Sequence, residues 1–116
     1  MTRPSFSAAV RCVVLTLGLV VAATAITKAQ YVAPNFRVYN GGSQTIMVLN
    51  VSPHGYNSWG PDLLGDNELN PGYFVRALAG FSLPSCIQDV RAIYADHEIQ
   101  YFWGIDVCTE NLTFRR

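Results

Sequence analysis

The sequence predicts an all-β protein, a small antiparallel β-sandwich of about five or six short strands with one long loop rich in glycine and proline. Two observations support this fold class. Short runs of β-branched, aromatic and other apolar residues recur along the chain, and glycine, proline, asparagine and aspartate separate them. In addition, 50% of the 116 residues are hydrophobic and only 14% are charged, which is typical of one folded domain.

The first two expected strands are residues 36–39 and 45–51, which flank the sequence Asn40-Gly41-Gly42. Asn-Gly between two strands is a strong signal for a tight turn, so these strands are expected to pair as a hairpin. Residues 52–72 follow, and their seven glycines and prolines exclude a long helix or strand. This segment is therefore expected to form the long loop.

Four more strands are expected after the loop. Residues 73–78 follow a Pro-Gly pair, and residues 90–94 and 99–107 are apolar and aromatic runs. Small and polar residues at 95–98 suit a tight turn, so the last two runs are expected to form a second hairpin. Residues 112–114 form the final short strand and complete the predicted sandwich.

The register of the second hairpin predicts a disulfide bond. If the turn is centred on His97, Cys86 lies directly opposite Cys108. The same register places Arg91 opposite Trp103, where a cation–π contact is expected. Zinc is the weaker alternative, because the two cysteines lack the paired C-x-x-C spacing of zinc sites and have no histidine close in sequence.

The N-terminal segment, residues 1–29, is predicted to be a signal peptide. It begins with basic residues and continues with an uncharged apolar run at 12–26, and small residues allow cleavage after Ala25 or Ala29. The run has 15 residues, fewer than the roughly 20 that a membrane-spanning helix needs. The alternative is a retained anchor, which would make the protein an accessory subunit of a membrane complex.

Cleavage changes the charge of the chain. The full sequence has 8 basic and 8 acidic residues, but three of the basic ones lie in residues 1–29. The remaining domain, residues 30–116, has 5 arginines against 8 acidic residues, a net charge of −3. This balance argues against nucleic acid and, after cleavage, against anionic membrane surfaces as partners. The two cysteines left in it predict an oxidising location, periplasmic or secreted.

Acidic residues in the long loop are candidate metal ligands. Asp62, Asp66 and Glu68 lie within seven positions of a glycine-rich segment, and oxygen ligands on such a loop suit calcium. They do not follow the EF-hand pattern, and the alternative is an ordinary turn with solvated side chains. Metal binding is therefore the second hypothesis for function, and no other cofactor is indicated.

Catalysis is not expected from this sequence. His54 lies close to Ser52 and Ser58, but the chain has no G-x-S-x-G motif and no phosphate-binding glycine loop. Asp89 and Arg91 are expected to form a local ion pair on one strand face. Residues 96–98, Asp-His-Glu, are expected to be an exposed turn rather than a metal site.

Two aromatic residues in the long loop are the candidate binding residues. Tyr56 and Trp59 can stack on a ligand, a sugar or a partner protein. The alternative for Trp59 is structural, a lid folded back over one open end of the sandwich. Two glycosylation sequons begin at Asn50 and Asn111, and they matter only in a eukaryotic secretory pathway.

Several segments of the chain resemble a group of small exported proteins of α-proteobacteria. The segments are SP at 52–53, WGPDLLG at 59–65, PG at 71–72, and the pattern C-x-x-DVRA-x-YAD…DVC at 86–108. The resemblance implies a bacterial exported protein and assigns no catalytic residues. It also implies glycine after the Ala-Asp of the second hairpin, where this chain has His97. The leading functional hypothesis is therefore an exported binding or interaction module.

Overall fold

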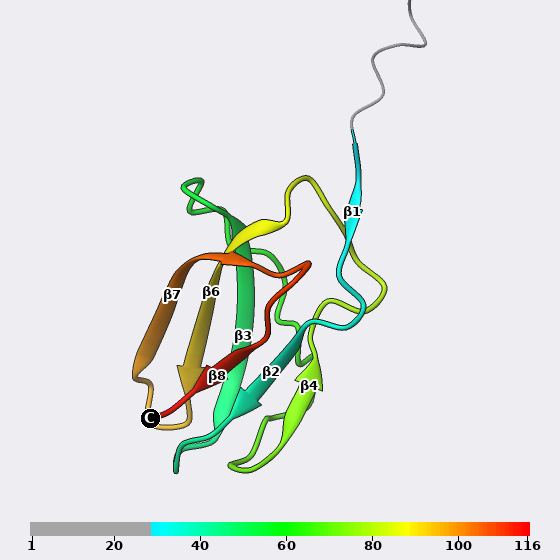
Figure 1. Ribbon diagram of the computed structural model, residues 1–116. Helices are drawn as coiled ribbons and strands as arrows, with labels where there is room; N and C mark the ends of the chain where they lie inside the picture. The colour runs from blue at the N-terminus through cyan, green and yellow to red at the C-terminus, as the bar shows by residue number, and fades with distance from the viewer. Residues whose placement is uncertain (1–28) are drawn as a thin grey trace, which may run out of the picture.

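The computed structural model describes residues 29–116, which form an all-β domain with eight strands and no helix. Two three-stranded sheets pack face to face as a small β-sandwich, as the sequence predicted (Figure 1). The predicted signal peptide and its alternative, a membrane anchor, lie almost wholly outside the described residues. Within residues 29–116, no helix is long and apolar enough to cross a membrane.

The strands are short, and only three of them have eight residues. Their bounds are β1 (Tyr31–Val32), β2 (Arg37–Asn40), β3 (Ile46–Pro53), β4 (Phe74–Arg76), β5 (Ser82–Leu83), β6 (Ile87–Tyr94), β7 (Ile99–Asp106) and β8 (Leu112–Phe114). One sheet has the antiparallel order β3-β6-β7, and the other has the order β4-β2-β8, in which β2 and β8 are parallel. The remaining strands, β1 and β5, form a two-stranded ribbon.

The core lies between the two sheets. Alternate residues of β6 are buried, because successive side chains of a strand point to opposite faces. The largest fully buried apolar side chains come from both layers and from the connecting segments: Tyr94, Phe36, Phe114, Ile46, Leu49 and Leu78. The opposite face of the β3-β6-β7 sheet is left for the site described below.

The predicted first hairpin is wrong. The turn Asn40-Gly41-Gly42 is present, but β2 pairs with β4 and β8, whereas β3 pairs with β6 in the other sheet. The Gly41 N–H donates to the carbonyl of Phe114, and a Cβ on Gly42 would overlap the backbone of Arg116. The two glycines therefore let the chain cross between layers beside its own C-terminus.

The second hairpin forms, with a register different from the predicted one. Ile93 pairs with Ile99, so the turn is centred on Asp96 and not on His97, and Arg91 faces Tyr101 rather than Trp103. A β-bulge then shifts the register by one residue, and Gly104 in the bulge has a φ of +66°. In the turn His97 itself has a φ of +72°, at the position where the resemblance implied glycine.

The predicted disulfide is confirmed. Cys86 and Cys108 are bonded, with their Cα atoms 5.4 Å apart, although they are offset by one residue in the register and not directly opposed. The Val107 N–H donates to the Cys86 carbonyl and continues the ladder to the last residue before Cys108. The disulfide thus joins the start of β6 to the turn that follows β7.

Candidate functional site

Three aromatic side chains gather on the face of the β3-β6-β7 sheet that points away from the core. We call Trp59, Tyr101 and Trp103 the aromatic cluster. The Tyr101 and Trp103 rings stack with centroids 4.8 Å apart, and the Trp59 ring lies 5.8 Å and 6.3 Å from them. Phe102, between the two β7 residues, packs instead on Phe114 in the core.

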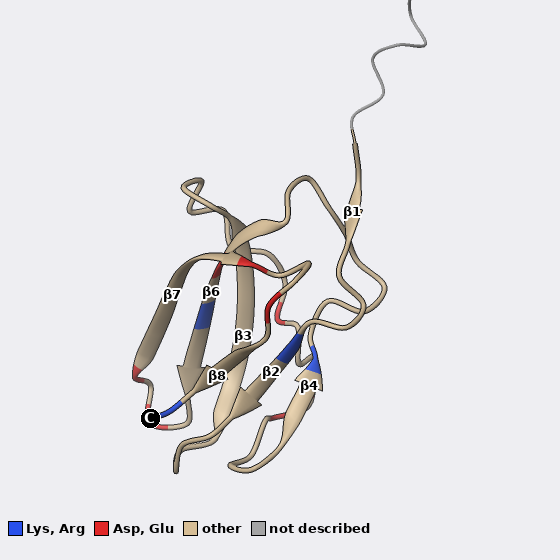
Figure 2. Cartoon of the chain, in the orientation of Figure 1, with Lys and Arg blue, Asp and Glu red and all other residues tan. Residues whose placement is uncertain are grey.

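The β6 arginine fixes Trp59 against the sheet. The Arg91 guanidinium lies 4.7 Å from the centre of the Trp59 ring and donates two hydrogen bonds to the Asn50 Oδ1 atom. The Asn50 amide in turn donates to the carbonyl of Gly60. Arg91, the blue band on β6 in Figure 2, therefore joins the loop to the sheet. The expected Asp89–Arg91 ion pair is not formed, and Trp59 is not a lid over an end of the sandwich.

Asp89 anchors the loop from the other side. It is 2% exposed, and its carboxylate accepts hydrogen bonds from the Gly104 N–H in the bulge (2.8 Å), the Gly55 N–H (3.1 Å) and the His54 Nδ1 atom (2.7 Å). Burial alone would raise the pKa of Asp89, but these hydrogen bonds outweigh it and hold the pKa below its ordinary value. The ionised carboxylate thereby ties residues 54 and 55 to β7.

The His54 ring donates to Asp89 because Asp89 is ionised. A carboxylate can only accept, so the His54 Nδ1 atom carries a proton in this contact. The His54 side chain is 55% exposed. The Ser52 hydroxyl donates to the carbonyl of Pro53 and accepts from the Ser58 N–H. Within residues 29–116 no hydroxyl or thiol is hydrogen-bonded to His54, so no nucleophile adjoins the His54–Asp89 pair.

The sequence-predicted binding residues separate in the structure. Trp59 joins the aromatic cluster, whereas Tyr56 is 76% exposed at the tip of the loop, outside the cluster. Tyr101 and Trp103 were not among the binding residues expected from the sequence. Their spacing of two on a strand was the available signal, because it puts both rings on the same side of a sheet.

The three candidate calcium ligands are not gathered into a metal site. The Asp62 Oδ1 atom accepts hydrogen bonds from the N–H groups of Leu49 and Leu64, which is a structural role. Asp66 and Glu68 are exposed. In the described part of the chain, the only three potential ligands that lie within 4.8 Å of one another are Asp106 and the two cysteines of the disulfide.

The turn residues at 96–98 form surface ion pairs. Arg116 donates to Asp96 at 2.8 Å and lies 3.8 Å from Glu98, and its guanidinium covers the Tyr94 ring. The hydrogen bond from Arg116 outweighs the slight desolvation of Asp96 and lowers the pKa of this carboxyl. These contacts tie the C-terminus to the hairpin, and residues 96–98 form an exposed turn, as expected.

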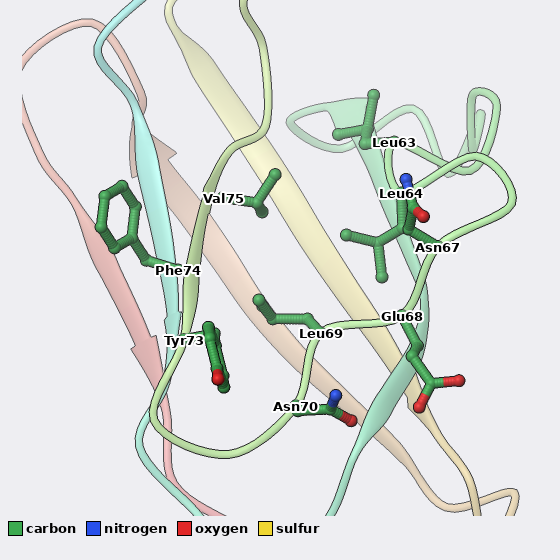
Figure 3. Close-up of a pocket in the computed structure, with 9 residues that line it drawn as sticks. All are labelled: Leu63, Leu64, Asn67, Glu68, Leu69, Asn70, Tyr73, Phe74 and Val75. Carbon is green, nitrogen blue, oxygen red and sulfur yellow. The ribbon is translucent and has the colours of Figure 1, made fainter.

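A cavity of about 330 Å³ lies between the long loop and β4, on the other side of the domain (Figure 3). The side chains of Leu63, Leu64, Leu69 and Val75 give it an apolar lining. Figure 3 shows Leu69 directed toward Tyr73, while the carboxylate of Glu68 points away from both. Asn67, Glu68, Asn70 and Tyr73 also line the cavity, so its lining is mixed. The aromatic cluster, in which Arg91 fixes Trp59, is the better-built candidate site.

Comparison of the chain with protein-family models, with curated proteins and with solved structures found no match.

Proposed function

We propose that residues 30–116 form an exported binding module, which recognises a partner protein or surface component through the aromatic cluster. The observation that carries this proposal is the exposure of large rings held in fixed positions. Tyr101 and Trp103 are 41% and 58% exposed, on a sheet face that takes no part in the core. Aromatic side chains of this kind supply most of the binding energy in many interfaces.

The anchoring of Trp59 supports the same proposal. Its loop is attached through Arg91 and Asn50 at one end and through Asp89 at the other, so the ring does not have to be ordered when a partner binds. Preorganisation of this kind lowers the entropy cost of binding. The domain has a net charge of −3, which favours partners with basic or neutral surfaces.

The disulfide is compatible with an oxidising compartment, which supports a periplasmic or secreted location for the module. Intact-mass measurement of the protein from its native cell tests this part of the proposal. Loss of the first 25 or 29 residues indicates a cleaved leader, whereas the full mass indicates a retained anchor.

The binding proposal is tested by immobilising three forms of the domain and comparing what each captures from the exported fraction of its own organism. These are the wild type, Trp103→Ala, and Tyr73→Ala as a matched exposed aromatic far from the cluster. Trp103→Ala is expected to weaken the binding free energy for the specific ligand by about 2 kcal/mol, which raises Kd roughly thirtyfold. Tyr73→Ala should retain it. If Trp103→Ala binds everything that the wild type binds, the cluster is not the site.

A further inference from the structure

The sheet that carries the aromatic cluster ends in an open strand edge. In the order β3-β6-β7, the strand β7 has a neighbour on one side only. The Tyr94 N–H donates to the Glu98 carbonyl, and hydrogen-bonded pairs alternate along an antiparallel ladder, so residues 100 and 102 bond to β6. The N–H and C=O groups of Ile99, Tyr101 and Trp103 therefore point outward. No turn or loop within residues 29–116 hydrogen-bonds to them.

The opposite edge of the same sheet is covered by the long loop. The Gly60 N–H donates to Val51, the Leu63 N–H donates to Leu49, and Leu69 exchanges two hydrogen bonds with Ile46. In the second sheet the edge strands β4 and β8 have only three residues each. Proteins usually cover, shorten or charge their strand edges, because an open edge pairs with other chains. The stretch 99–103 is therefore the one long edge of the described domain that the chain leaves open.

The side chains of this stretch favour an added strand. Ile99, Tyr101 and Trp103 all point to the outer face and are 47%, 41% and 58% exposed. A strand paired with β7 would set its alternate side chains beside these three. Aromatic residues paired across strands with β-branched residues are among the favourable combinations. Edge and cluster thus form one continuous surface.

Charge decides between a second copy and a different partner. The stretch 99–103 has no charged residue, but Asp96 and Glu98 lie at one end of β7 and Asp106 at the other, as the red segments of Figure 2 show. Arg116 balances only one of the two acidic residues at the first end. Two copies paired antiparallel about Tyr101 would set Asp106 of one copy opposite Asp96 of the other, and like charges in that position are destabilising.

We infer that the open edge of β7 binds an extended, basic segment of a partner protein, which adds to the sheet as a fourth strand with apolar residues at alternate positions. The inference rests on the proposed function and specifies its partner. Main-chain hydrogen bonds at residues 99, 101 and 103 supply affinity, and the aromatic cluster reads the alternate side chains. Basic residues at both ends of the segment face Glu98 and Asp106.

The test uses a fluorescein-labelled nonapeptide, Lys-Val-Thr-Val-Thr-Val-Thr-Val-Lys, whose two lysines span the separation of Glu98 and Asp106, and fluorescence anisotropy. One control has glutamate in place of both lysines, and two others are N-methylated at the odd or at the even positions, so that each lacks the donors of one edge. The variant Tyr101→Pro removes the outward N–H and leaves the bonds between β6 and β7 intact, which proline tolerates on an edge. Tyr101→Ala is its matched control, because it removes the same ring and keeps the N–H. We expect the basic peptide to bind at least tenfold more tightly than the glutamate control and than one of the two N-methylated forms, and Tyr101→Pro to lose this preference with its melting temperature little changed.

The outcomes separate this inference from the proposed function. Equal binding of the parent and both N-methylated forms (methylated at odd or at even positions) refutes strand addition, and so does failure of every peptide to bind. In both cases the capture experiment with Trp103→Ala still decides whether the cluster binds something else. A dimer in sedimentation velocity that Tyr101→Pro abolishes would assign the edge to a second copy and also overturn the inference. The N-methylated peptides keep the test valid if Tyr101→Pro fails to fold.

Discussion

Replacing Asp89 with asparagine tests how the candidate site is held together. The buried carboxylate accepts three hydrogen bonds, but an asparagine has one acceptor oxygen. If that oxygen keeps the bonds to Gly104 and His54, the Gly55 N–H faces the new NH₂ group, which is itself buried without an acceptor. An unsatisfied buried donor costs about 1–3 kcal/mol, and exchanging two charge-assisted hydrogen bonds for neutral ones costs about 1 kcal/mol more.

We therefore expect Asp89→Asn to lower the free energy of unfolding by about 2–4 kcal/mol, or the melting temperature by roughly 8–32 °C for a domain of this size. The measurement is urea denaturation at neutral pH. Both tryptophans of the chain lie in the aromatic cluster, so tryptophan emission reports directly on the loop. Asp66→Asn, at an exposed position of the same loop, is the matched control and should cost nothing measurable.

The difference between wild type and Asp89→Asn should depend on pH. Because the folded pKa of Asp89 lies below its unfolded value, the ionised carboxylate stabilises the fold fully above the unfolded pKa, about 3.9. That contribution is lost as the pH falls through the folded pKa. The two stability curves should therefore converge in acid. A cost below about 0.5 kcal/mol at neutral pH, or a difference that stays constant down to about pH 2, would refute this account.

Three further predictions concern the frame of the domain. Cys108→Ala removes the disulfide to Cys86, 22 positions earlier in the chain, and should lower the free energy of unfolding by about 3 kcal/mol. Denaturation without reductant measures this loss. Gly42→Ala pushes a methyl group into the backbone of Arg116 and should cost about 1–3 kcal/mol; an unchanged melting temperature would contradict the crossing described above. Calcium at millimolar concentration should leave the melting temperature unchanged, because Asp62 is already engaged by two backbone N–H groups. A calcium-dependent rise would restore the metal hypothesis.

Local pattern was sufficient to predict the fold class and most strands. The strands β3, β6, β7 and β8 lie where runs of β-branched and aromatic residues predicted them, within a few residues. The strands β1 and β5 have two residues each, and so short a segment has no periodicity to detect. The disulfide was predicted because the two cysteines are equidistant from His97. The turn is centred one residue earlier, which offsets them by two residues, and the one-residue bulge reduces this offset to one.

Pairing between distant segments could not be predicted in the same way. The sequence Asn40-Gly41-Gly42 does reverse the chain, but a turn signal says nothing about which strands then hydrogen-bond. Here β2 pairs with β8, about 74 residues further along the chain, and β3 pairs with β6. Each of these partners is chosen by which apolar faces fill the core, and no local pattern encodes that choice.

The candidate site has the same limitation. The His54–Asp89 contact joins residues 35 positions apart, and the bulge at Gly104 that brings a third donor to Asp89 has no separate sequence signal beyond one glycine. Sequence reasoning therefore paired Asp89 with Arg91, its neighbour on the strand. It did find Trp59, because an aromatic residue next to Gly-Pro in a loop is conspicuous without any knowledge of the fold.

The alternation of β7 is the strongest argument that this face has a role beyond folding. A sheet with one solvated face normally has apolar residues inside and polar residues outside. In β7 the outward positions are Ile99, Tyr101 and Trp103. An inward position is Gln100, whose side-chain oxygen accepts a hydrogen bond from the Tyr94 hydroxyl. Exposed aromatic rings contribute little to the stability of the isolated domain. Truncating Trp103 should therefore lower the free energy of unfolding far less than truncating the buried Phe114. It should weaken partner binding more than truncating Phe114 does. The reverse result would mean that the cluster serves the fold alone.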